Sequence, residues 1–149
     1  MNHPVVRIGV FLSPALLLLL YTACSRQRPK NQPETVPVSG VVTYQGQPVE
    51  GARLAFLADT PGVQGGVALT DANGKFIAMT FEQGDGLVPG SFTVTVVKTV
   101  GGELTENSEA PPVPVKNVLP RKYERRETSP LKVEVKKGEP NNFTFDLGD

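Results

Sequence analysis

The chain has one cysteine and one histidine, the two side-chain types that most often carry nucleophilic or metal chemistry. They are Cys24 and His3. A thiol can act as a nucleophile, as a metal ligand or as the acceptor of a covalent group. Cys24 stands where the apolar run that ends in Leu16–Leu20 gives way to the polar segment that begins at Ser25. The position of Cys24 at this boundary is therefore the best indication of which of these roles it has.

Residues 1–23 have the pattern of an export signal. Arg7 gives the start a positive charge, and an almost unbroken apolar run follows from Ile8 to Tyr21. A membrane-spanning helix needs about 20 apolar residues, and this run is shorter. It ends in the small residues Thr22 and Ala23. A basic start, a short apolar middle and a small-residue end predict a signal peptide that is removed from the mature protein.

The four residues Tyr21-Thr22-Ala23-Cys24 resemble the lipobox of bacterial lipoproteins. In that family a peptidase cuts before the cysteine after its sulfur has received a diacylglyceryl group. The resemblance implies that Cys24 is lipidated and that acyl chains such as palmitate hold the protein on a membrane, more firmly than one chain would. In this family an aspartate directly after the cysteine is associated with retention at the inner membrane. The chain has Ser25 there, and the resemblance therefore favours the outer membrane. A plain signal peptide or an uncleaved anchor is the alternative.

Removal of the signal would leave 149 − 23 = 126 residues, enough for one domain and a tether. The mature chain would carry 14 basic and 15 acidic side chains, so its net charge of −1 offers no broad attraction for nucleic acid. It would also lack histidine and a free thiol, which excludes Ser-His-Asp and Cys-His catalysis and structural zinc. The sequence predicts no cofactor and no metal site.

From Val38 onward, short runs rich in Val, Thr, Phe and Tyr alternate with glycine-containing turns. Alternation of apolar and polar residues predicts strands with one buried face. The predicted strands are Val38–Tyr44, Gly51–Leu57, Gly66–Thr70, Lys75–Phe81, Ser91–Lys98, Leu131–Val135 and Phe143–Leu147. This spacing predicts an all-β domain over residues 38–149, an antiparallel β-sandwich of about seven strands. Residues 24–37, polar and rich in proline, are predicted to be a tether.

Two connections stand out. In the segment TDANGKF, Asn73-Gly74 is a hairpin signal, and the Asp71 carboxylate is placed to brace the turn. Residues 99–130 form a proline-containing stretch of about thirty residues without a sustained period. Connections of that length inside a compact domain are uncommon and tend to be functional or disordered.

The ordered pieces VSGVVTYQGQPVEGARLAF, TDANGKF, GDGLVPGSFTVTV, LPRKY and LKVEVKKGEPNNFTFDL are similar to those of small bacterial lipoproteins, numerous in planctomycetes, with a carboxypeptidase regulatory-like or transthyretin-like domain. The resemblance extends from Val38 to Leu147, apart from stretches near 59–65 and 99–117. It implies an Ig-like or prealbumin-like sandwich. It implies little about activity, because fold alone does not define function.

Calcium binding and hydrolysis are the first alternatives to a non-catalytic role. An EF-hand loop beginning at Asp71 would place Lys75 and Phe76 at positions that require a ligand and a glycine. A hairpin turn explains that segment better. Hydrolysis by some transthyretin-like proteins depends on histidines, which the mature chain would lack, and no spacing of carboxylates indicates a glycosidase pair.

The remaining alternatives are ligand binding and protein–protein contact. The chain has no tryptophan, so Tyr123 and Tyr44 are the rings that could be exposed to a sugar. Core or edge packing is the alternative for both and is favoured for Tyr44, so Tyr123 is the candidate ligand-binding residue. An open sandwich also has edge strands that can accept another strand. The sequence favours a non-catalytic, lipid-anchored interaction or structural module of the cell envelope, with envelope or surface proteins as partners. A small-ligand or carbohydrate-binding lipoprotein is the alternative.

Overall fold

The computed structural model describes residues 29, 31–101 and 114–149. Cys24 and the predicted signal peptide, residues 1–23, lie outside the described residues. The chain divides into two compact units, Met1–Gln32 and Pro33–Asp149, and the second carries all the strands and every buried hydrophobic side chain that the structure describes. Within the described residues, no helix has the length and apolar character needed to cross a membrane.

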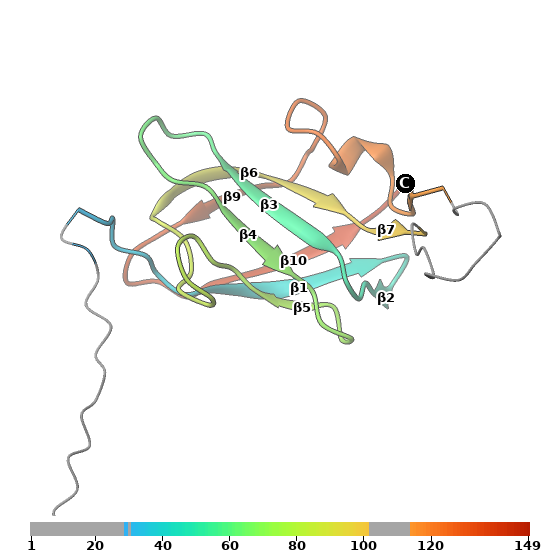
Figure 1. The fold of residues 1–149 in the computed structure, drawn as a ribbon, viewed down its shortest axis with the longest axis horizontal. Helices are drawn as coiled ribbons and strands as arrows, with labels where there is room; N and C mark the ends of the chain where they lie inside the picture. Colours follow the sequence, from blue (N-terminus) through green and yellow to red (C-terminus); the bar gives the residue numbers. More distant parts are fainter. Residues whose placement is uncertain (1–28, 30, 102–113) are drawn as a thin grey trace, which may run out of the picture. The chain divides into compact units, whose positions relative to one another are not determined.

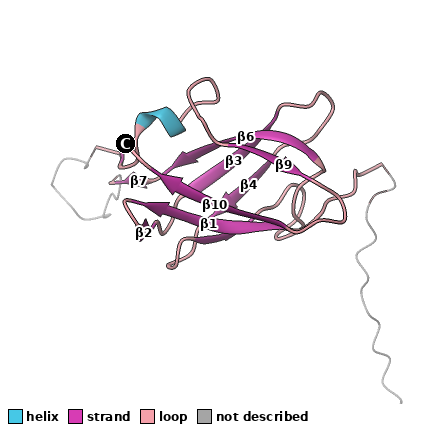
Figure 2. Cartoon of the chain, turned by 180° about the vertical axis from the view of Figure 1, so that it is seen from behind, coloured by secondary structure: helices cyan, strands magenta, loops and turns pink. Residues whose placement is uncertain are grey.

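The first sheet is built around β1 (Val38–Tyr44). On one side β1 pairs with β10 (Asn141–Leu147), and on the other it pairs with β5 (Lys75–Ile77) and the short β2 (Gln47–Pro48). β5 and β2 run antiparallel to β1, whereas β10 runs parallel to it. Figure 2 shows β1 and β10 side by side.

The second sheet has the order β4-β3-β6-β9, and all of its pairs are antiparallel. It consists of β4 (Gly66–Leu69), β3 (Arg53–Ala58), β6 (Gly90–Val97) and β9 (Lys132–Val135). In Figure 1 these strands cross the view above β1 and β10. The described part of the domain is therefore all-β with two main sheets, as the sequence predicted.

Phenylalanine rings join the two sheets through the core. The ring centroid of Phe56 on β3 lies 6.0 Å from that of Phe76 on β5. It lies 6.5 Å from that of Phe92 on β6, and these two rings meet edge-on. Phe76 in turn stacks on Phe145 of β10 at 5.9 Å. Separations of this size are those at which aromatic pairs attract beyond their burial alone. The alternating apolar residues of both sheets therefore face one shared core.

The prediction that the sandwich is antiparallel throughout is wrong for β1 and β10, which pair in parallel from Val38 opposite Asn141 to Tyr44 opposite Leu147. The turn signals in the sequence fix the direction only of strands that a short connection joins. β1 and β10 are the first and last strands of the unit, so no turn constrains their direction.

Gly40 shows why this parallel pair needs a residue without a side chain. A Cβ atom at this position would collide with the carbonyl oxygen of Phe143 on β10 and would approach the ring of Phe76 to 2.7 Å. The absence of a Cβ therefore allows β1 to lie against β10 while Phe76 fills the core beneath them.

Each of the seven predicted strands has a counterpart, with some changed ends. β5 is shorter than predicted, because the N–H groups of Thr80 and Phe81 bond to the Asp85 carboxylate (2.8 and 3.1 Å) instead of continuing a ladder. Three strands of two residues were not predicted: β2 already named, β7 (Thr99–Val100) and β8 (Lys116–Asn117).

The predicted long loop, residues 99–130, is partly ordered where the structure describes it. β7, at the start of this stretch, pairs with β8, and a 3₁₀ turn, η1 (Arg121–Tyr123), drawn cyan in Figure 2, follows β8. Leu119 and Tyr123 from this stretch are buried in the core. Since the apolar residues are isolated among prolines and charges, no period in the sequence revealed that they pack.

Candidate functional site

Tyr123 does not present the exposed ring that the sequence predicted. Only 4% of the residue is exposed. Its hydroxyl donates a hydrogen bond to the carbonyl oxygen of Gly148 and accepts one from the Gly148 N–H, each at 3.1 Å. A buried ring cannot offer a face to a sugar, so the prediction that Tyr123 binds a ligand through an exposed ring is corrected. The residue fastens η1 to the end of β10.

Tyr44 is partly exposed at the end of β1, but its hydroxyl is engaged. It donates a hydrogen bond to the Asp149 carboxylate at 2.8 Å. That bond, the largest cause, raises the pKa of the Tyr44 hydroxyl above its ordinary value, since ionisation would remove the donated proton and oppose the carboxylate charge. The arrangement ties the end of β1 to the C-terminal residue of the described chain.

Asp71 braces the hairpin turn as the sequence predicted. One oxygen of its carboxylate accepts hydrogen bonds from the N–H groups of Asn73 (2.8 Å) and Lys75 (2.9 Å). Gly74 supplies the positive φ, 71°, that closes the turn. Among the described residues, no group of three His, Cys, Asp or Glu side chains is placed to hold a metal ion.

A groove of about 750 Å³ crosses the outer face of the first sheet. Small-molecule sites commonly measure about 300–1,000 Å³, so the groove is large enough for one. Its lining comes from β1, β5 and β10, from the end of β4 and from the segments before and after β5. The lining residues are Ser39, Gly40, Val41, Leu69, Asp71, Lys75, Phe76, Ile77, Met79, Gln83, Gly84, Asn142 and Thr144.

The apolar part of the groove lies where the hairpin between β4 and β5 opens. Two backbone hydrogen bonds of 2.9 Å join Val67 to Met79, and another joins Asp71 to Lys75. Between them, no backbone hydrogen bond joins Leu69 to Ile77. The two strands belong to different sheets and separate there. Leu69 and Ile77 are 62% and 64% exposed, and both line the groove.

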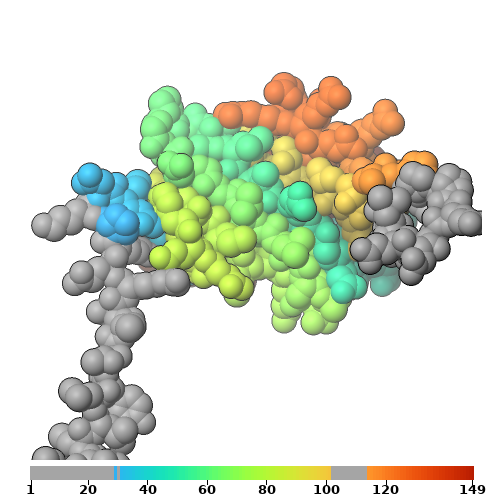
Figure 3. Space-filling view, viewed as in Figure 1, coloured from blue at the N-terminus to red at the C-terminus, as the bar shows by residue number. Residues whose placement is uncertain are grey.

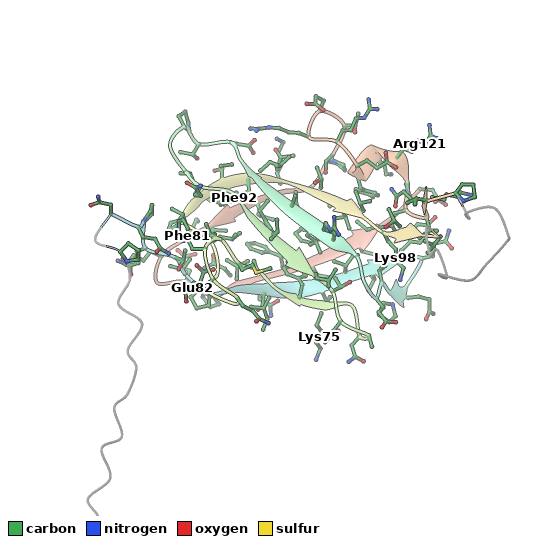
Figure 4. All side chains as sticks on the ribbon, in the orientation of Figure 1. Lys75, Phe81, Glu82, Phe92, Lys98 and Arg121 are labelled. Atoms are coloured by element: carbon green, nitrogen blue, oxygen red, sulfur yellow. The ribbon has the colours of Figure 1, made fainter. Side chains whose placement is uncertain are left out.

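The polar part of the groove consists of neutral hydroxyl and amide groups, one lysine and the Asp71 carboxylate. In the described part of the chain, no side-chain hydrogen bond or ion pair engages Ser39, Asn142, Thr144 or Gln83. Farther along the same strands, by contrast, Thr43 donates to Asp146 at 2.9 Å. Lys75 projects away from the sheet at one end of the groove, and Phe81 and Glu82 lie on the loop that follows β5 (Figure 4). The groove thus combines an aliphatic patch with hydrogen-bonding groups that are available to a ligand.

A charged cluster lies on the outer side of the second sheet. The Asp59 carboxylate accepts hydrogen bonds from the Thr93 hydroxyl (2.9 and 3.0 Å) and from the Arg126 guanidinium (2.8 Å), and the Lys132 ammonium lies 3.9 Å away. The Thr93 hydroxyl, followed by the charges of Lys132 and Arg126, lowers the pKa of Asp59 below its ordinary value against an opposing effect of desolvation. Arg126 also donates to the carbonyl oxygen of Ala58 at 2.9 Å.

No local pattern predicted this cluster, because Thr93 and Arg126 lie 34 and 67 positions after Asp59, in different segments. The Arg126 contacts join the segment after η1 to the end of β3. The Thr93 and Lys132 contacts join that end to β6 and β9. Its role is therefore structural.

A second hollow, of about 560 Å³, lies beside η1 and is lined by Arg121, Lys122, Glu124, Arg125 and Thr128. Lys122 donates to the carbonyl oxygen of Asp149 at 2.6 Å, and Glu124 accepts from Asn117 at 2.7 Å. Arg121 and Arg125 are exposed, and Figure 4 shows Arg121 at the surface. This hollow is basic and open. The groove on the first sheet is the better candidate site, because the exposed aliphatic side chains of Leu69 and Ile77 line it beside its polar groups.

No known protein family and no curated protein matches the chain in sequence. Among solved structures, the chain is similar to a 9R-lipoxygenase from Cyanothece PCC8801, with a TM-score of 0.38 and 14% sequence identity. The similarity covers 83% of this chain and 18% of that one, so the chain spans under a fifth of the lipoxygenase. A likeness at this level carries no conclusion about activity.

Proposed function

We propose that this chain is an exported lipoprotein, anchored by acyl chains on Cys24, whose sandwich serves as a non-catalytic interaction or structural module of the cell envelope. The basic start, the short apolar run and Thr22-Ala23-Cys24 support the export and the anchor. The Ig-like or prealbumin-like character of the sandwich, and the kinship with carboxypeptidase regulatory-like lipoproteins, belong to this proposal. The outer membrane or another membrane surface facing the periplasm is the proposed location.

The observation that best supports an interaction role is the groove on the first sheet. Its exposed Leu69 and Ile77 cost hydration free energy in the isolated protein, and a partner that covered them would recover it. The proposed mature chain has no histidine and no free thiol. It therefore lacks the side chains of Ser-His and Cys-His catalysis, and the proposed role is non-catalytic.

Capture from detergent-solubilised envelopes tests the proposal. We expect the lipidated protein to retain a defined set of envelope proteins, and Ile77→Lys to lose them, because a charge would be buried under the partner. Val115→Lys is the matched control, since Val115 is equally exposed, at 64%, and lies outside the groove. Equal capture by wild type and both variants would contradict a role for the groove.

A small-ligand or carbohydrate-binding lipoprotein is the second candidate, and the unengaged Ser39, Asn142 and Thr144 favour it. A glycan array separates the two candidates. Glycan binding that Asn142→Ala and Ile77→Lys both abolish, without captured proteins, would support the second. No glycan binding together with captured proteins would support the first.

A further inference from the structure

The last strand of the first sheet, β10, has an open edge. Within the described residues β10 pairs only with β1. The Phe143 carbonyl group points toward Gly40 on β1, and Gly148 uses both its N–H and its C=O on the other side, with Tyr123. Backbone groups alternate sides along a strand. Asn142, Thr144 and Asp146 therefore direct their N–H and C=O groups away from β1.

The protein closes both ends of this edge and leaves its middle open. At one end Tyr123 bonds to Gly148, and at the other the Asn141 side chain bonds to Lys136 and Glu139 in the turn before β10. Proteins usually protect exposed edges with lysine, proline or a bulge. The stretch from Asn142 to Asp146 contains no lysine and no proline, and its unbroken one-to-one register with β1 contains no bulge.

We propose that β10 pairs antiparallel with β10 of a second copy of this chain, about a two-fold axis at Thr144. In this register Thr144 faces the second copy's Thr144, and Asn142 faces its Asp146. The three open residues of each strand then bond with one another, each pair exchanging two hydrogen bonds. A closed dimer of this kind uses the same surface on both subunits.

Registers centred on the other two open residues fit less well. Centring the pair on Asp146 would set two carboxylates directly opposite, which is destabilising, and would bring the second strand against Tyr123 at Gly148. Centring it on Asn142 would place Pro140, which has no N–H, opposite Thr144. In the Thr144 register the second copy's strand ends at Asn141, opposite Leu147, before it reaches Tyr123.

Side chains on both faces of β10 suit this register. On the outer face an amide meets a carboxylate on each side of a threonine pair, and cross-strand pairs of these kinds are favourable. On the inner face the partly buried Phe143 would meet the second copy's Phe145, extending the ring row in which these two residues already stack at 6.3 Å. The pairing does not depend on the lipid anchor, so its test is independent of the proposed function.

Cysteine crosslinking tests the register in the chain from residue 24 with Cys24→Ser, which retains the whole unit Pro33–Asp149 with its core. Across the axis the Cα atoms of Thr144 would be about 5.5 Å apart, within disulfide reach. Those of Asn142 would be roughly 14 Å apart, which is beyond disulfide reach. We expect Thr144→Cys to form a disulfide dimer under mild oxidation and Asn142→Cys to remain at least tenfold less crosslinked.

Light scattering at rising protein concentration provides the second measurement. Wild type is expected to dimerise, and Thr144→Pro to weaken the dimer by roughly tenfold or more, since it removes the central donors. Thr144→Val keeps the N–H and is expected to dimerise like wild type. A monomer at all concentrations, or equal crosslinking of the two cysteine variants, would overturn the proposal. If Thr144→Pro failed to fold, the cysteine pair would decide alone.

Discussion

The hydroxyl of Tyr123 both donates to and accepts from Gly148, at 3.1 Å in each direction, and so joins η1 to the end of β10. A single side chain thereby satisfies both backbone groups of one residue. Since the ring is also buried in the core, this contact anchors the described end of the long connection, residues 114–130, to the sandwich.

Tyr123→Phe should lower the free energy of unfolding by about 1 kcal/mol, the usual contribution of a hydrogen bond that water can partly replace. Tyr123→Ala should cost about 3–5 kcal/mol, since it also leaves a cavity. Urea unfolding measures both. Tyr44→Phe removes a more exposed hydroxyl and is the control, expected to change stability less. Equal losses for the two Phe variants would contradict the anchoring role.

Gly40→Ala should be strongly destabilising, because the new methyl group would meet the Phe143 carbonyl oxygen and the Phe76 ring. Overpacking of this kind costs about 1–3 kcal/mol and occasionally more, and here backbone as well as side chain must move. Gly148→Ala has nothing within 4 Å of the new atom and should be nearly neutral. Thermal unfolding of both variants is the measurement; a neutral Gly40→Ala would show that the parallel pairing of β1 and β10 is not as described.

Asp59→Asn should reduce stability at neutral pH and have little effect in acid. The pKa of Asp59 is lower in the folded protein than in the unfolded chain, so the ionised carboxylate stabilises the fold. That contribution is present above the unfolded-state pKa of about 3.9 and is lost as pH falls through the folded-state value. Urea midpoints of both proteins from pH 7 downward should converge in acid. A constant difference across this range would contradict the assignment.

Asp71→Ala should cost about 1 kcal/mol, since it removes a carboxylate oxygen that holds two backbone N–H groups. Asp71→Asn keeps one acceptor oxygen and should cost less. Calcium should leave the unfolding temperature of all three proteins unchanged, because the carboxylate serves the turn. A rise in wild type that Asp71→Asn abolishes would instead indicate a calcium site.

The sequence predicts those parts of the fold that depend on local chemistry. Alternation identified β6, β9 and β10, and the signal at Asn73-Gly74 identified a turn that Asp71 does brace. The parallel direction of β10 escaped prediction, because it depends on a contact between segments about a hundred residues apart.

The candidate groove could be predicted only in part. Leu69 and Ile77 lie within the predicted strands Gly66–Thr70 and Lys75–Phe81, and nothing local shows that the hairpin between them opens as its two strands enter different sheets. Tyr123 failed as a ligand candidate for a related reason: charged neighbours suggested exposure, whereas the ring turns inward and its neighbours remain at the surface. In Figure 3 much of the visible surface comes from the green to yellow-green segments, which contribute both β4 and the loop after β5.

The intact mass of the protein isolated from its native membrane, with its partition between detergent and water, tests the proposed anchor most directly. We predict a chain that begins at Cys24, is heavier than the polypeptide by the mass of its acyl chains and enters the detergent phase, whereas Cys24→Ser gains no such mass. A full-length chain that begins at Met1 and carries no acyl group would contradict the account.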